Sequence, residues 1–164
     1  MAILFVVCPD KTLILGFGSD ALSDDGLPLR LVHELQTAPG NERFDFNTSP
    51  VGGLELLELL RGYNRVILID TQLTCRRKPG TVSFFTPDNF EETFHLSSQH
   101  DLSFHHTLKL AKDLDIPFPS AIHVIAIEIS ENKKLSFEFS DEIKVRYSGI
   151  FKIISKGLAE TPWN

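Results

Sequence analysis

The chain has 164 residues, of which 42% are hydrophobic, and it carries a net charge of −6 at neutral pH. This length and composition predict one domain, residues 1–164, with a core of its own. The negative charge argues against nucleic acid or an anionic membrane as a partner, because both attract basic proteins. No apolar run approaches the roughly 20 residues of a membrane helix. Cys8 and Cys75 are too few for a disulfide framework, so we expect a cytoplasmic protein.

The first half of the chain alternates between predicted strands and helices. Continuous apolar runs indicate buried parallel strands, whereas apolar residues spaced three and four apart indicate helices. An additional strand is expected over the apolar run Ala2–Cys8, which has no basic residues before it and no cleavage site after it. The other predicted strands are Leu13–Gly18, Arg43–Asn47 and Val66–Asp70, and the helices between them are Leu27–Gln36 and Leu54–Leu60.

The rhythm changes after Asp70. The segment Thr71–Pro79 is too short and too polar for a crossover helix, so the next strand, Thr81–Phe85, is expected to run antiparallel to its predecessor. A helix over Asp101–Leu114, a strand over Ala121–Ile129 and a last helix capped by Ser140 follow. This order predicts an α/β fold, a three-layer αβα sandwich. Its central sheet is mostly parallel, with five strands, or six with the N-terminal run, and one antiparallel strand.

In a parallel sheet the ligand site lies beyond the carboxyl ends of the strands. The polar residues at those ends are Ser19–Asp25, Asp70 and Glu128. Gly16-Phe17-Gly18-Ser19-Asp20-Ala21 also matches a dinucleotide-binding fingerprint in form. That motif requires a helix that starts at the glycines, but here the helical pattern begins only near Pro28, and three aspartates of the loop would repel phosphates. The alternative is that Gly16 and Gly18 merely allow a tight turn.

A second hypothesis for this edge of the sheet is a metal or cation site made from Asp25, Asp70 and a histidine. Two carboxylates at the ends of neighbouring strands repel each other unless they share a cation or a proton. The structural alternative is that Asp24 or Asp25 caps the helix that begins near Pro28, and that Asp70 only starts a turn. His100 is the natural third ligand, because it lies just before a helix, where a neutral imidazole is favoured.

Other hydrolytic sites find less support in the sequence. There is no Gly-x-Ser-x-Gly nucleophile elbow and no His-Glu-x-x-His zinc helix. The basic residues Arg76-Arg77-Lys78 next to Cys75 are either a solvated turn or a dock for an acidic partner, and the sequence leaves both open.

Taken together, six segments in register resemble the hydrogenase maturation endopeptidases over most of the chain, from Thr12 to Leu158. They are listed here in chain order: Leu13-Ile14-Leu15-Gly16-Phe17-Gly18 followed by Ser23-Asp24-Asp25-Gly26, Gly53-Leu54-Glu55-Leu56-Leu57, Val66-Ile67-Leu68-Ile69-Asp70, Pro79-Gly80-Thr81-Val82, and Ser97-Ser98-Gln99-His100-Asp101-Leu102.

The resemblance implies an endopeptidase that removes a C-terminal extension from the large-subunit precursor of a nickel-containing hydrogenase, after nickel insertion. It implies an αβα sandwich and the metal ligands Asp25, Asp70 and His100. It also implies that the nickel is supplied by the substrate, and we expect that another divalent cation such as zinc can substitute. We expect Asp24, Thr48 and Ser49 to contact the substrate. The implied partner is the precursor, and we expect a monomer that binds neither nucleic acid nor membrane.

The chain departs from the family pattern after the second predicted strand. There the family usually has an acidic residue, two glycines and Thr or Ser, whereas this chain reads Asn47-Thr48-Ser49-Pro50-Val51. A Gly-Ile-Gln-Pro-like turn after the last strand is replaced by Ala126-Ile127-Glu128-Ile129-Ser130. These changes fall where the family recognises its substrate. The alternative function is therefore a noncatalytic relative that binds or senses the metal without cleaving.

Overall fold

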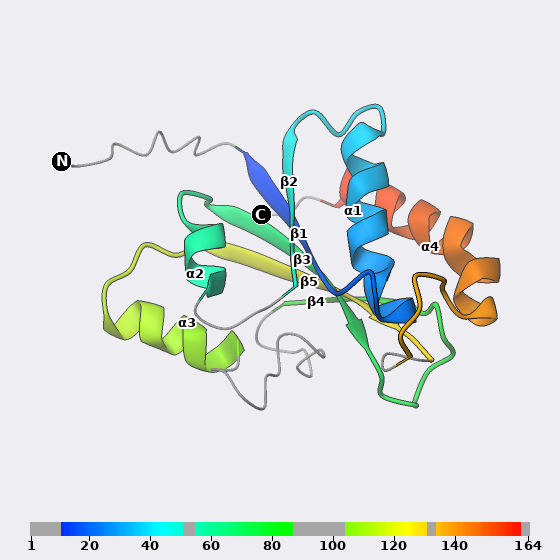
Figure 1. Ribbon diagram of the computed structural model, residues 1–164. Helices are drawn as coiled ribbons and strands as arrows, with labels where there is room; N and C mark the ends of the chain where they lie inside the picture. Colours follow the sequence, from blue (N-terminus) through cyan, green and yellow to red (C-terminus); the bar gives the residue numbers. More distant parts are fainter. Residues whose placement is uncertain (1–10, 51–54, 87–103, 131–133, 162–164) are drawn as a thin grey trace.

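The computed structural model describes residues 11–50, 55–86, 104–130 and 134–161. These residues form one five-stranded sheet, in the order β2-β1-β3-β5-β4, with helices on both sides (Figure 1). The strands are β1 (Thr12–Phe17), β2 (Phe44–Ser49), β3 (Arg65–Gln72), β4 (Val82–Phe85) and β5 (Ala121–Glu128). The helices are the 3-10 turn η1 (Ser23–Gly26) and α1 (Leu27–Thr37), α2 (Glu55–Leu60), α3 (Phe104–Asp113) and α4 (Asp141–Glu160).

The predicted sheet topology is confirmed. β1 is parallel to both β2 and β3, and β3 is parallel to β5. β4 is antiparallel, as its short connection predicts, and it pairs with β5 rather than with its predecessor β3. β1, β3 and β5 are apolar on both faces because helices cover both sides of the sheet.

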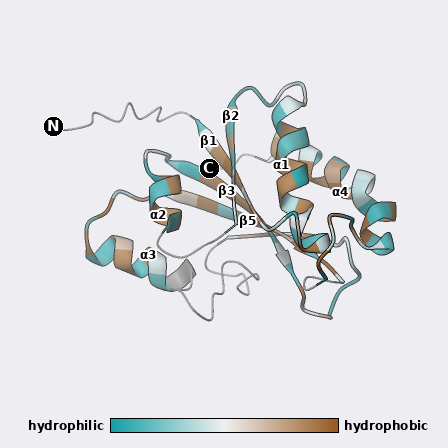
Figure 2. Cartoon of the chain, viewed as in Figure 1, coloured by the Kyte–Doolittle hydropathy of each residue, from teal (hydrophilic) through white to brown (hydrophobic). Residues whose placement is uncertain are grey.

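The sandwich has two separate cores, one on each face of the sheet. α1 and α4 pack on one face against Ile14, Ile67 and Ile125, whereas α2 and α3 pack on the other face near Leu13 and Leu68. Each helix is two-sided, with hydrophobic and hydrophilic residues (Figure 2). The predicted three-layer αβα architecture is therefore confirmed, and the predicted N-cap Ser140 accepts a hydrogen bond from the Ile143 amide at the start of α4.

Some element boundaries differ from the prediction. β2 extends through Thr48 and Ser49, so these residues end the strand instead of following it. β3 continues two residues past Asp70 because Thr71 and Gln72 still pair with β5. The N-terminal run and the predicted start of the helix at Asp101 lie outside the described residues.

Gly16 belongs to β1 rather than to a tight turn, and its role is to let α1 approach the sheet. A Cβ at this position would lie 2.8 Å from Val32 Cγ2 and 3.0 Å from the Pro28 carbonyl oxygen. The tight-turn interpretation is therefore wrong for Gly16, and close packing of a helix on a strand replaces it.

We predict that Gly16→Ala lowers the free energy of unfolding by about 1–3 kcal/mol, because α1 must move away from β1. Gly149→Ala in α4 is the matched control, since its new methyl group would have no atom within 4 Å apart from its chain neighbours and the backbone of its own helix. That variant should gain about 0.5–1 kcal/mol from helix propensity alone. Urea unfolding of both variants measures the difference, and equal effects would contradict the packing argument.

Candidate functional site

Residues 19–26, which we call the acid loop, connect β1 to α1 and carry Asp25. The Asp25 side chain is fully buried, and its Oδ2 accepts a hydrogen bond from the Ser19 amide at 2.8 Å. Gly18 makes this arrangement possible, because a Cβ there would lie 2.0 Å from the Asp25 carbonyl oxygen and because its φ of +153° is unusual for other residues. The loop therefore folds back onto the end of β1 and holds its carboxylate in place.

Thr71 joins the two predicted acids at the carboxyl ends of β1 and β3. Its hydroxyl donates to Asp25 Oδ1 at 3.2 Å, and its amide donates to Asp70 Oδ1 at 2.8 Å. All three side chains are fully buried. The structure thus places Asp25 and Asp70 at one edge of the sheet, as expected for the ends of neighbouring parallel strands.

Asp24 points to a different part of the molecule from Asp25. Its Oδ1 accepts from the Ser140 amide at 2.7 Å, and its Oδ2 accepts from the hydroxyls of Ser140 at 2.8 Å and Ser130 at 3.2 Å. The carboxylate lies at the N-terminus of α4, where the helix dipole favours a negative charge. Asp24 is fully buried, as Asp25 and Asp70 are, and these partners lie at the start of α4 and just after the end of β5, so its predicted substrate contact stays a prediction.

The expectation that Asp24 or Asp25 caps α1 is wrong. The N-cap of α1 is Gly26, which makes no side-chain capping hydrogen bond. Pro28 lies in the first turn, where a proline fits because the amides there have no partner within the helix. The two aspartates instead form hydrogen bonds with distant elements: Asp25 with Thr71 of β3, and Asp24 with Ser140 at the start of α4.

Glu128 shapes the turn that follows β3. Its Oε1 accepts from the amides of Thr74 at 2.7 Å and Cys75 at 2.9 Å, and its Oε2 accepts from the Thr74 hydroxyl at 2.8 Å. These bonds hold Cys75 at a positive φ of 56°. Glu128 therefore orders the basic turn Arg76–Lys78, whose side chains are exposed although Arg77 also donates to the Ser83 hydroxyl.

Of the other predicted site residues, Thr48 and Ser49 lie at the end of β2, and His100 lies outside the residues that the structure describes. The Ser49 carbonyl accepts from the Gly18 amide at 3.2 Å, so the end of β2 adjoins the acid loop, and Thr48 is exposed beside it. Within residues 11–50, 55–86, 104–130 and 134–161, no three His, Cys, Asp or Glu side chains form a metal-binding group.

Sequence reasoning missed Thr71, and it named Ser19 only as the start of the polar segment Ser19–Asp25, without a role of its own. Neither carries charge or belongs to a metal-ligand motif, yet each orients Asp25 through one hydrogen bond. The available signal was a hydroxyl residue directly after the strand-end Asp70. Partners of this kind commonly fix the orientation of metal ligands.

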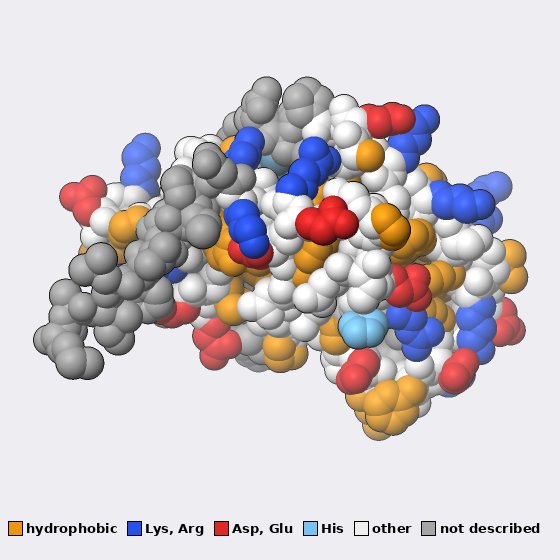
Figure 3. Space-filling view, turned by 90° about the horizontal axis from the view of Figure 1, so that it is seen from above, with side chains coloured by type: hydrophobic (Ala, Val, Ile, Leu, Met, Phe, Trp, Pro, Cys, Tyr) orange, Lys and Arg blue, Asp and Glu red, His pale blue; other side chains and the backbone are white. Residues whose placement is uncertain are grey.

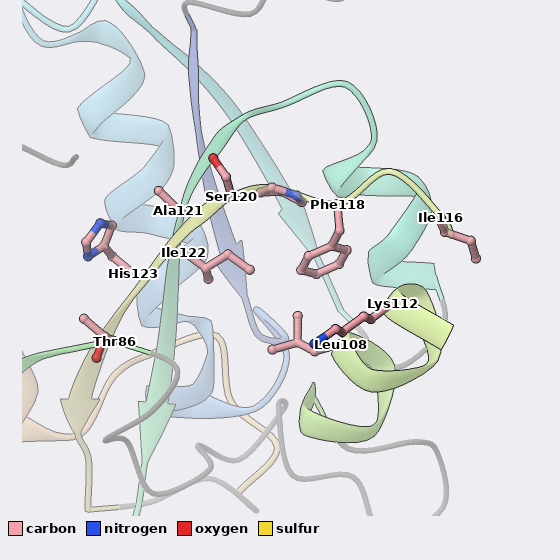
Figure 4. A pocket seen from close by; sticks show the side chains of 10 residues that line it. Thr86, Leu108, Lys112, Ile116, Phe118, Ser120, Ala121, Ile122 and His123 are labelled. Carbon is pink, nitrogen blue, oxygen red and sulfur yellow. The ribbon is translucent and has the colours of Figure 1, made fainter. Parts of the chain in front are cut away.

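A cavity of about 710 Å³ lies away from this edge, between α3 and the beginning of β5 (Figure 4). Leu108 and Phe118 lie on one side of β5, and His123 and Thr86 lie on the other. Burial lowers the pKa of His123, which favours the neutral imidazole. Since the cavity adjoins Ala121 and Ile122, at the opposite end of β5 from Glu128, it does not belong to the site of Asp25 and Asp70.

The surface charge is mixed in sign. On the face seen in Figure 3, acidic and basic side chains are interspersed rather than separated into areas of one sign. Among the described residues, no helix is long and apolar enough to cross a membrane.

We predict that Asp24→Ala lowers the free energy of unfolding by about 3 kcal/mol, because the amide of Ser140 and two hydroxyls lose a buried acceptor. Ser140→Ala should cost about 1–2 kcal/mol through the lost cap. Since the two residues share one network, the double variant should lose less than the sum of the two. Urea unfolding tests this, and additive losses would contradict the shared network.

Comparison with known proteins identifies the family. The sequence model described as hydrogenase maturation protease matches residues 29–156. No match was found among curated proteins. The chain is similar to the hydrogenase maturating endopeptidase HybD from E. coli, with 17% identity, a TM-score of 0.67, and coverage of 93% of this chain and 94% of that one.

A second similar structure is the [NiFe] hydrogenase maturation protease HybD from Thermococcus kodakarensis. It is 27% identical, with a TM-score of 0.59 and coverage of 89% of this chain and 97% of that one. The family match covers most of the chain, from the first turn of α1 through β3, which carries Asp70, to the last turns of α4. The chain belongs to the hydrogenase maturation protease family.

Proposed function

We propose that this protein is the endopeptidase that removes the C-terminal extension of the large-subunit precursor of a nickel-containing hydrogenase. Family membership supports the reaction class. The structural observation that carries the proposal is Thr71, which hydrogen-bonds to both Asp25 and Asp70 and so holds two carboxylates together at the ligand-binding edge of the sheet.

The donor set suits a borderline divalent metal. Two carboxylates with an imidazole from His100 would bind nickel or zinc and would leave coordination positions for substrate groups. Hydrogen bonds from Ser19 and Thr71 already orient Asp25, as expected for a ligand that must meet a metal in one geometry. The proposed metal is the nickel that the precursor carries; held by these residues, it would polarise a carbonyl or activate a water.

This arrangement makes cleavage depend on the maturation state of the precursor. Two carboxylates at one edge repel each other unless they share a cation, so a precursor that brings nickel would be bound in preference to one without it. With nickel, the same carboxylates would hold the metal and the chain attached to it. Thr48 and Ser49 lie beside the acid loop, where they could contact that chain.

We predict that wild-type protein shortens a nickel-loaded precursor and that Asp25→Asn, Asp70→Asn and His100→Ala each abolish the shortening, because each removes a metal ligand. Asp20→Asn is the matched control, since Asp20 is an exposed acid of the same loop. Mass spectrometry of the precursor measures the product, and circular dichroism checks folding. Normal cleavage by a folded ligand variant would remove that residue from the proposed metal site.

The same assay separates the protease from its noncatalytic alternative. A wild-type protein that binds the nickel-loaded precursor and leaves its C-terminus intact would be a metal-sensing relative. In that case Asp25→Asn and Asp70→Asn would weaken binding of the nickel-loaded precursor, although wild type does not cleave it.

We predict that Thr71→Val lowers the rate of processing by about 10- to 100-fold without abolishing it, because Asp25 loses a partner that orients it while both carboxylates remain. Thr37→Val is the control, since it also removes a hydroxyl that forms one hydrogen bond, to the Glu34 carbonyl at the end of α1. Initial rates of precursor shortening measure both. Equal rates for wild type and Thr71→Val would contradict a role of Thr71 in positioning Asp25.

A further inference from the structure

Building on the proposed function, we propose that the groove between α1 and β2 binds an extended segment of the precursor. The segment would pair with the outer edge of β2 and insert one uncharged side chain into a cavity beside it. The inference rests on the cavity, on the direction of the β2 backbone groups and on the link between β2 and the acid loop.

The cavity has a volume of about 320 Å³ and lies between α1 and the carboxyl-terminal half of β2. This is the lower end of the range for ligand pockets and large enough for a side chain. Leu29, Val32 and Phe46 form its apolar part, and Gln36, Asn47 and Thr48 contribute polar groups. His33 also lines it, and none of the lining residues is an Asp, Glu, Lys or Arg, so a charged side chain would find no counter-ion there.

The backbone at the end of β2 is directed towards a strand that would lie outside the sheet. The Ser49 carbonyl faces β1, because it accepts from the Gly18 amide. Since backbone groups alternate in direction along a strand, the amide and carbonyl of Phe46 and the carbonyl of Thr48 face away from β1. β2 is the edge strand on this side of the described sheet, and exposed edges bind extended peptides.

The outer edge of β2 suits a short peptide better than a second copy of the chain. The amides of Phe44 and Thr48 also face outward, but they already donate to the Asn41 carbonyl at 3.0 Å and to Asn47 Oδ1 at 2.8 Å. Pairing is therefore concentrated around Phe46, directly beside the cavity. A dimer formed along the whole strand would have to break both hydrogen bonds.

The groove leads directly to the acid loop. The Gly18 amide donates to Ser49, the last residue of β2, and the next amide, that of Ser19, donates to Asp25 Oδ2. An extended peptide advances about 3.3 Å per residue, so a segment on β2 reaches Asp25 within a few residues. The groove would thus hold the precursor near the bond that is cleaved.

Filling the cavity tests the inference. We predict that His33→Trp and Gln36→Trp raise the KM for nickel-loaded precursor by about 10- to 100-fold, because the inserted side chain is excluded, with little change in kcat. Both positions are exposed on α1, so folding should be preserved. Lys152→Trp, at an exposed position of α4, controls for a surface tryptophan and should keep the wild-type KM.

The outcomes distinguish this inference from the function on which it rests. If wild type processes the precursor and both α1 variants keep the wild-type KM, the groove does not bind the precursor. The proposed protease function would then still stand. Absence of processing by wild type overturns the proposed function and the groove with it. Analytical ultracentrifugation adds a third readout, the oligomeric state. If wild type is a dimer and the α1 variants are monomers, the groove binds a second copy of the chain, and the proposal that it binds a precursor peptide is wrong.

Discussion

The hydrogen bond between the Thr71 hydroxyl and Asp25 is the interaction on which the candidate site depends. The acid loop and β3 belong to different parts of the chain, and this bond joins their carboxylates at one edge of the sheet. Asp24, the adjacent residue, binds the N-terminus of α4 on the other side. Two successive carboxylates thus fix the loop between the sheet and a helix, which determines where Asp25 points.

Burial gives this arrangement its chemical character. A fully buried carboxylate is costly unless hydrogen-bond donors stabilise it, and Asp24, Asp25 and Asp70 each accept from at least one amide. These donors orient the side chains before any ligand arrives. If Asp25 and Asp70 bind the proposed metal, they would need little reorganisation to do so, and Asp24 would stabilise the loop that carries Asp25.

The proposed peptide groove and the proposed metal site are parts of the same edge. The amides of Gly18 and Ser19 connect them, one bound to the end of β2 and the other to Asp25. Gly18 permits both contacts, because a side chain there would collide with the Asp25 backbone. Binding of an extended chain and recognition of its metal would then depend on one loop conformation.

The sequence by itself determined the layers and strand directions, because continuous apolar runs and helical spacing report burial directly. It also placed the segment Ser19–Asp25 and Asp70 at one edge, since residues at the ends of neighbouring parallel strands must share an edge, and the family resemblance added Asp25 as the ligand. The residue pattern could not show that Asp24 binds the N-terminus of α4 rather than α1, and it did not reveal the role of Thr71 or the groove beside Phe46. Only the tertiary structure decided these, because a side chain's hydrogen-bond partner is chosen by segments distant in the chain, such as Ser140 for Asp24.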